Sequence, residues 1–274
     1  METDDPVELV DERAAPAGDT RMSLPTPTTA AIEALAPTGT LRAAINLSNF
    51  LLVSSTADDG TPIGVSPDMA ATLAQQLGVE VEFQTYENPG DVADAVVAGV
   101  WDIGNIGAEP ARAVNINFTA AYAEIESTYL VPPGSSISTF SDVDQPGMRI
   151  SVKERAAYAL WLERNLQHAE LVQSETLDTS FDIFVDRRLD ALAGLRPRLM
   201  ADVERLPGAR VLDGRFSVVQ QAIGTPRDRD AAGVDFLSDF VEWAKSSGLV
   251  ARSIAAHATS GLSVAALIDP EASP

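Results

Sequence analysis

The sequence contains no cysteine. A disulfide framework, a thiolate zinc site and a cysteine nucleophile are therefore excluded, and the redox compartment stays undetermined. Basic side chains are also few, because 19 Lys and Arg stand against 40 Asp and Glu and leave a formal net charge of −21. A chain this acidic repels nucleic-acid phosphates and anionic lipid, so we expect neither nucleic acid nor a membrane surface as a partner.

Long apolar runs are missing as well. No stretch approaches the roughly 20 apolar residues that a membrane span requires, so we expect no membrane insertion. The first ten residues include Glu2, Asp4, Asp5 and Glu8 and have none of the basic, apolar and small-residue regions of a signal peptide. As written, the sequence predicts a soluble cytoplasmic protein. Removal of a leader would make it periplasmic.

From Thr40 onward, short apolar strands alternate with helices of about ten residues, which is typical of α/β layering. Ser66-Pro67-Asp68 predicts the start of a helix with Ser66 as N-cap, and Gly78 would end this helix in a left-handed conformation. Val79–Thr85 then follows as a strand, since its apolar and polar residues alternate. The same alternation restarts near Met148, which indicates a second lobe.

Several short motifs occur in a fixed order. They are Gly39-Thr40-Leu41-Arg42, Gly64-Val65-Ser66-Pro67-Asp68, Gly99-Val100-Trp101-Asp102, Arg112, and Phe118-Thr119-Ala120-Ala121-Tyr122. In this order and at these separations they resemble the polar-amino-acid family of type II periplasmic binding proteins, the solute-binding proteins of ABC importers. The resemblance covers residue 39 to about residue 258 and rests on individually weak motifs. It implies a two-lobed α/β fold of the type II periplasmic binding class, with the ligand in the cleft between the lobes.

In that family two crossover strands join the lobes, and the segments Ser127–Pro132 and Val218–Gly224 match them. We therefore expect lobe I at 39–128 plus 221–259 and lobe II at 129–220. Residues 1–38, rich in Asp, Glu, Pro and Thr, are expected to form a flexible arm that includes a short helix near Ala30–Leu35. Residues 260–274 are expected to form a C-terminal tail.

The resemblance assigns Arg112 to the carboxylate of the ligand, because it lies six residues before Phe118, where the family has an arginine. A planar guanidinium can donate two parallel hydrogen bonds to a carboxylate. Nearby, Asn105 would hydrogen-bond the ligand through its side chain and Gly107 through its backbone N–H. The alternative for Arg112 is a structural arginine that pairs with a neighbouring carboxylate such as Glu109.

The second lobe departs from the family pattern in two places. Lys153-Glu154-Arg155-Ala156-Ala157 stands where the family has Q-x-G-T-T, and Leu195, followed by Arg196, stands where the family has the aspartate that pairs with an α-ammonium. An α-ammonium without an anionic partner is costly to desolvate, so we expect a ligand of net negative charge. Arg112, Lys153, Arg155 and Arg196 would hold it. The alternative is that the second-lobe charges are solvated side chains at helix starts.

Phe50 and Tyr158 are candidates for the aromatic walls of the cleft, although core packing is an equal alternative for each. Of Gln220 and Gln221, one is expected to line the cleft, because consecutive strand residues face opposite sides of a sheet. We assign Gln220.

The resemblance implies a small-molecule ligand, with an ABC permease as a partner. We expect no cofactor, no metal ion and no catalytic residue, since the sequence contains no triad, metal-ligand cluster or phosphate loop. Two alternatives stay open. One is an enzyme similar to the cyclohexadienyl dehydratases, which share this fold, with Glu154 or Glu109 as the acid or base. The other is an intracellular ligand-sensing domain.

Overall fold

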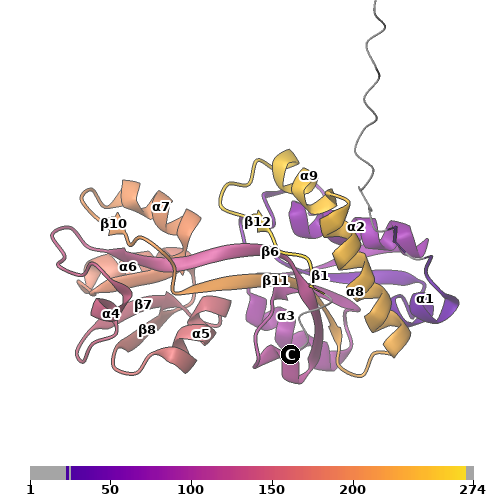
Figure 1. Cartoon of the computed structure of the whole chain (residues 1–274), viewed down its shortest axis with the longest axis horizontal. Coiled ribbons are helices and arrows are strands. Elements are labelled where there is room, and N and C mark those ends of the chain that lie inside the picture. The colour runs from indigo at the N-terminus through magenta and orange to yellow at the C-terminus, as the bar shows by residue number, and fades with distance from the viewer. Residues whose placement is uncertain (1–22, 25, 270–274) are drawn as a thin grey trace, which may run out of the picture.

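The computed structural model describes residues 23–24 and 26–269. The predictions that concern residues 1–22, residue 25 and residues 270–274, all in the expected arm and tail, lie outside the described residues. Figure 1 shows two lobes side by side, each with helices packed on a sheet, and two long strands that run from one lobe into the other.

The first lobe contains three parallel strands, β1 (Thr40–Asn46), β4 (Glu80–Tyr86) and β5 (Ile103–Gly107). β1 lies between the other two and pairs with both. The other elements of this lobe are α1 (Thr29–Leu35), β2 (Ser55–Thr56), β3 (Pro62–Ile63), α2 (Val65–Leu77), α3 (Pro89–Ala95), η1 (Val96–Ala98), η2 (Arg112–Val114), α8 (Ala231–Ser246), α9 (Leu249–Ala256) and β12 (Ser263–Val264).

The second lobe repeats this plan with β7 (Arg149–Lys153), β8 (Glu170–Ser174) and β9 (Ala191–Leu195). β7 is the central strand here and is parallel to both neighbours. The other elements of this lobe are α4 (Phe140–Val143), α5 (Ala157–Asn165), α6 (Leu177–Asp186), α7 (Arg196–Arg205) and β10 (Arg210–Val211).

Two long strands join the lobes. β6 (Ile116–Val131) and β11 (Ser217–Pro226) pair in antiparallel fashion along most of their length. β11 also pairs with β5 of the first lobe, and β6 pairs with β9 of the second, so the sheet has the order β4-β1-β5-β11-β6-β9-β7-β8. The two-lobed α/β fold is therefore confirmed. The predicted lobe limits at 128/129 and 220/221 fall inside β6 and β11 and stay a prediction.

Part of the expected flexible arm is folded. Thr28 caps α1 by accepting a hydrogen bond from the backbone N–H of Ala31 at 3.1 Å. Ala31 and Leu35 are buried, and α1 packs against α8 so closely that a Cβ at Gly233 would lie 2.7 Å from the Cβ of Ala34. The short helix expected near Ala30–Leu35 is thus confirmed as α1, and its apolar face is part of the core.

The predicted N-cap of α2 is also wrong. The helix begins at Val65 after Gly64, and no side chain caps it. The hydroxyl of Ser66 lies instead inside the fold, 2.9 Å from the hydroxyl of Tyr122 on β6. The predicted end of α2 is confirmed, since Gly78 has φ 71°. Local pattern alone could not reveal that a buried tyrosine would take the serine hydroxyl.

Asp102 holds the strands of the first lobe together. Its carboxylate is 0% exposed and accepts hydrogen bonds from Nε and Nη2 of Arg42, at 2.9 and 2.8 Å, and from Nη2 of Arg229 at 3.2 Å. The backbone N–H of Arg42 also donates to the carboxylate, and the hydroxyl of Thr225 donates to the Asp102 carbonyl. One residue thereby connects β1, the start of β5 and the end of β11.

We predict that Asp102→Ala lowers the free energy of unfolding by about 3–5 kcal/mol, because it leaves two partly buried arginines without their carboxylate. Urea denaturation measures this as a lower midpoint at an unchanged slope. Asp58→Ala is the control, since Asp58 is exposed, and it should stay within about 0.5 kcal/mol of the wild type. Similar midpoints for the two variants would show that the Asp102 contacts contribute little.

Candidate functional site

A small cavity of about 50 Å³ lies between the lobes and is called the inner cavity here. The last residues of four parallel strands line it, which is where open α/β sheets bind their ligands. Around them lie residues of the neighbouring loops and helices. The lining consists of Asn46, Ser48, Asn49, Pro89, Gly107, Arg112, Lys153, Ala156, Ala157, Tyr158, Leu177, Leu195, Val219 and Gln221.

Helix N-termini add positive potential to the inner cavity. Its lining includes the N-caps of α5 and α7, Ala156 and Leu195, and the first residue of α6, Leu177. The first N–H groups of a helix have no partner within the helix, and the helix dipole favours negative charge at this end. Neither α5 nor α7 has a side-chain cap, so backbone N–H groups at both starts stay available.

Arg112 is the cation of the first lobe in this cavity. Its side chain is buried, at 6% exposure, and its Nη1 and Nη2 donate to the carbonyls of Gly107 and Arg155 at 2.7 and 2.9 Å. Burial lowers the pKa of Arg112 to about 10, with a smaller opposing effect from Glu109. The guanidinium therefore keeps its charge at neutral pH, and both of these acceptors are neutral.

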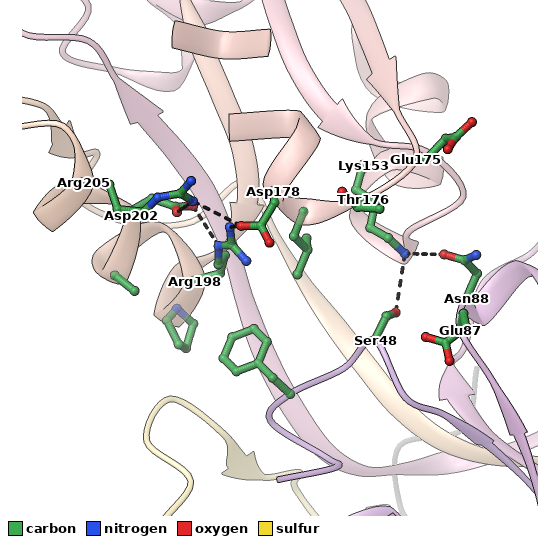
Figure 2. Close-up of a pocket in the computed structure, with 14 residues that line it drawn as sticks. Ser48, Glu87, Asn88, Lys153, Glu175, Thr176, Asp178, Arg198, Asp202 and Arg205 are labelled. Carbon is green, nitrogen blue, oxygen red and sulfur yellow. Dashed lines mark hydrogen bonds and ion pairs between the residues drawn. The ribbon is translucent and has the colours of Figure 1, made fainter. Parts of the chain in front are cut away.

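Lys153 is the cation of the second lobe. It ends β7 and is 4% exposed, and its Nζ crosses to the first lobe, where it donates to Oδ1 of Asn88 at 2.9 Å and to Oγ of Ser48 at 3.4 Å. Figure 2 shows this bridge. Burial is the main cause that lowers the pKa of Lys153 from its ordinary value.

The other two predicted cations are occupied elsewhere. Arg155 forms ion pairs with Asp91 and Asp94 of α3, at 3.0 and 2.6 Å, and does not line the inner cavity. Nε of Arg196 pairs with Glu126 of β6 at 2.8 Å, and Arg196 does not line the inner cavity, so its role at the ligand stays a prediction that this arrangement does not favour. Both arginines form ion pairs with acidic residues that the sequence analysis had not identified as their partners.

Ion pairs also connect the two lobes beside the inner cavity. Besides the Arg155 ion pairs, Arg164 of α5 pairs with Glu109 of the first lobe at 2.5 Å. A Cβ at Gly107 would lie 2.9 Å from Val219 and 3.0 Å from Ala157, so only glycine allows this approach. Glu109 thus forms its ion pair with Arg164, and the contacts of Arg112 are with the carbonyls of Gly107 and Arg155.

The remaining candidates are divided between cavity and core. Tyr158 lines the inner cavity, and its buried hydroxyl has no hydrogen-bond partner among the described residues. Asn105 is buried without a side-chain partner in that same part of the chain, but does not line the cavity. Gln220 does not line the inner cavity: its Nε2 donates to Glu124 at 3.0 Å, and Gln221 lines the cavity in its place.

A wider space of about 720 Å³, called the outer cleft here, adjoins the inner cavity. Phe50, 40% exposed, lies on its wall, as does the bridge of Lys153. Figure 2 shows an ion-paired cluster on the other side of this space. It consists of Asp178, Arg198, Asp202 and Arg205.

Sequence reasoning missed Ser48, Asn88 and Gln221. Ser48 and Asn88 follow the carboxyl ends of β1 and β4, a position that could have indicated the cleft. The choice between Gln220 and Gln221 depends on a register shift of the β6–β11 ladder directly after Gln221, which simple alternation does not predict.

The inner cavity has cations without counter-ions. No Asp or Glu lines it, and no carboxylate of the described residues lies within ion-pair distance of Arg112 or Lys153. The described part of the chain also brings no three His, Asp or Glu side chains together as a metal site. The arrangement is suited to binding an anion.

The chain was compared with known proteins. Residues 42–257 match the model of the bacterial extracellular solute-binding proteins, family 3. No curated protein matches.

Solved structures with the same fold include three informative ones. The ancestral amino-acid-binding protein AncCDT-1, described as a precursor of cyclohexadienyl dehydratase, is 19% identical with a TM-score of 0.68, over 83% of this chain and 99% of that one. A mutant of ArgBP from T. maritima is 18% identical, with a TM-score of 0.65, over 82% and 97%. A substrate-binding protein of an amino acid ABC transporter from Streptococcus pneumoniae, bound to L-arginine, is 17% identical, with a TM-score of 0.66, over 86% and 100%. At these identities the likeness concerns the fold.

The sequence has two lysines, and they should respond oppositely to substitution by methionine. Lys153 has no counter-ion among the described residues, so Lys153→Met should raise the free energy of unfolding at pH 7 by roughly 1–4 kcal/mol, as for other buried charges replaced by apolar side chains. Lys245 forms an ion pair with Glu242 at 2.6 Å and donates to the Ala266 carbonyl at 2.7 Å. Lys245→Met should therefore destabilise the protein.

The effect of Lys153→Met on the free energy of unfolding should depend on pH. Its pKa in the folded protein is below the ordinary 10.5, so its charge opposes folding fully below the folded pKa. This penalty fades as the pH rises from the folded pKa toward 10.5, and with it the advantage of Lys153→Met. Urea denaturation of both variants across this range is the measurement, and a destabilised Lys153→Met at neutral pH would contradict the prediction.

Proposed function

Since the chain belongs to family 3 of the bacterial extracellular solute-binding proteins, we propose that it binds a small metabolite that carries a carboxylate, in the inner cavity between its lobes. The two buried cations without counter-ions, Arg112 and Lys153, carry this proposal. A buried charge that lacks a partner is costly, and an anionic ligand removes this cost for the cations that it contacts.

Arg112 is the proposed anchor of the carboxylate. A guanidinium has five N–H groups, and the bonds to the carbonyls of Gly107 and Arg155 use two of them. The N–H groups at the start of α5 belong to the same cavity and would bind the same carboxylate. Tyr158, whose hydroxyl has no hydrogen-bond partner in the described part of the chain, supplies a further donor.

The lining also argues against a simple amino acid zwitterion. Leu195 borders the inner cavity, and no carboxylate among the lining residues is placed to receive an α-ammonium. The S. pneumoniae protein is described as bound to L-arginine, a ligand of net positive charge. In this chain Arg112 and Lys153 would repel such a ligand from the cavity. We therefore propose an acid without a compensating ammonium.

Binding requires movement of the lobes. A volume of about 50 Å³ holds little more than one water molecule, whereas ligand sites usually measure about 300–1,000 Å³. We propose that the lobes separate about β6 and β11 to admit the ligand and close on it afterwards, as in other hinged binding proteins.

We propose that the protein acts outside the cytoplasm and that its partner is an ABC permease. The family is one of extracellular proteins, which favours the periplasmic alternative over the cytoplasmic prediction. Among the residues that the structure describes, none of the helices combines the length and the apolar composition that crossing a membrane would take.

We predict that a panel of small carboxylic acids contains at least one compound that raises Tm by several degrees. A ligand at 100 times its Kd adds about 2.7 kcal/mol to stability. Arg112→Ala should then weaken binding of that acid by about 2–5 kcal/mol, and Arg112→Lys by at least tenfold, since an ammonium cannot reproduce a two-point contact. Calorimetry measures both.

Arg215→Lys is the matched control, because Arg215 pairs with Glu126 and does not line the inner cavity. It should bind the acid like the wild type. If Arg112→Lys and Arg215→Lys both bind within about threefold of the wild type, Arg112 is structural and the proposed anchor is wrong.

A dehydratase is the second candidate, because AncCDT-1 is described as a precursor of one. Such an enzyme needs a positioned acid or base. Glu109 is held by Arg164, and neither it nor Glu154 lines the inner cavity. We therefore predict that prephenate, a cyclohexadienyl acid, is recovered unchanged by chromatography after incubation with the protein. Turnover above the uncatalysed background would favour a dehydratase over a binding protein.

A further inference from the structure

Lys153 separates the two spaces of the cleft. It lines both the inner cavity and the outer cleft, as do Ser48 and Leu177. Its Nζ reaches from β7 to Ser48 and Asn88 of the opposite lobe, so its side chain and its two hydrogen bonds lie across the boundary. Figure 2 shows the bridge from the side of the outer cleft.

We infer that Lys153 is a gate that selects a short dicarboxylate, whose second carboxylate replaces Asn88 and Ser48 as the partner of Nζ. The inference rests on the proposed function, because Arg112 holds the first carboxylate. The inference specifies the charge and the length of the ligand, neither of which is determined by the contact with Arg112 alone.

The charge argument follows from the number of buried cations. Arg112 and Lys153 both line the inner cavity, and neither has a carboxylate partner among the described residues. A monocarboxylate bound to Arg112 leaves Lys153 in a closed cleft with neutral acceptors only. A dicarboxylate gives each cation a counter-ion, and the remaining donors of the lining, such as Tyr158, are all suited to oxygen acceptors.

The bridge of Lys153 is easily exchanged for a carboxylate. Its acceptors are an amide oxygen and a hydroxyl oxygen, and the second contact is long at 3.4 Å. Exchange of these neutral acceptors for a carboxylate adds the attraction between opposite charges to the hydrogen bond of Nζ. Asn88 also has another partner, since its Nδ2 donates to Asp91 at 3.3 Å. Loss of the bridge therefore frees Oδ1 of Asn88 and leaves its Nδ2 bonded to Asp91.

The length argument follows from the two volumes. The inner cavity measures about 50 Å³ and the outer cleft about 720 Å³, and Lys153 stands at the boundary between them. Once the lobes have moved to admit it, a ligand that is anchored at Arg112 and ends at Nζ stays on the inner side of Lys153. A longer ligand has to push the lysine aside and to give up its charge contact. Removal of the lysine side chain joins the two spaces and lifts this limit.

The experiment uses the full chain and α,ω-dicarboxylates from malonate to adipate. Each is paired with the monocarboxylate in which one carboxylate is replaced by a methyl group, such as pentanoate for glutarate. Calorimetry gives Kd for the wild type, Lys153→Met and Asn88→Ala. For the wild type we expect one short diacid to bind at least tenfold more tightly than its paired monoacid, which corresponds to about 1.4 kcal/mol.

Lys153→Met should lose this preference, because it removes the charge. Lys153→Ala, measured in the same way, also removes the bulk of the side chain and should bind the longest diacid at least as tightly as the shortest. Asn88→Ala keeps the charge of Lys153 and removes only its neutral partner, so it should retain the preference for a diacid. Equal affinities for diacid and monoacid in the wild type would overturn the inference, and so would an unchanged preference in Lys153→Met.

A second measurement reports on the lysine itself. Lys153 and Lys245 are the only lysines of the sequence, so acetylation by an amine-reactive reagent, followed by mass spectrometry, measures Lys153 with Lys245 as an internal reference. The best diacid should lower acetylation of Lys153 at least threefold more than its paired monoacid does. Equal protection by both acids would contradict direct contact with Nζ.

Failure of the inference differs from failure of the proposed function. If an acid binds and Arg112→Lys weakens it, but diacids gain nothing from Lys153, the inference alone is wrong. If no acid of the series binds the wild type, the proposed function and the inference are both wrong.

Discussion

The antiparallel pairing of β6 with β11 is the interaction on which the rest of the structure depends. Both lobes add their parallel strands to this pair, β5 on one side and β9 on the other. Because the pair continues through both lobes, the carboxyl ends of the strands face each other across the cleft. The cations at these ends, Lys153 on β7 and Arg112 beyond β5, could not share a cavity without it.

Much of the fold and one part of the site could be predicted from the sequence. Alternation of apolar residues located β4, Gly78 located the end of α2, and ordered weak motifs indicated two lobes. Arg112 was assigned by its distance from Phe118, and the structure places it in the cavity. These features succeed because they depend on local geometry or on a spacing that a single element fixes.

The remaining assignments depend on partners that lie far away in the sequence. Arg155 and Arg196 look like ligand-binding cations in the sequence, but acidic residues of α3 and β6 neutralise them. Gln220 was assigned in place of Gln221 from the sequence, in which the register shift that follows Gln221 cannot be seen. A charge pattern in one segment reveals which cations exist, and only the folded chain reveals which of them keep a free charge.

The ion pairs that connect the two lobes beside the inner cavity have a consequence for the balance between open and closed forms. Arg155 and Asp94 are largely exposed, at 42% and 72%, so this pair contributes at most about 1 kcal/mol and is screened by salt. Such an ion pair shifts the equilibrium between open and closed forms only slightly. To shift it from 1:99 to 99:1, a ligand has to favour the closed form by about 5.5 kcal/mol. If the protein binds its ligand as proposed, occupancy of the cavity contributes more to closure than this exposed ion pair does.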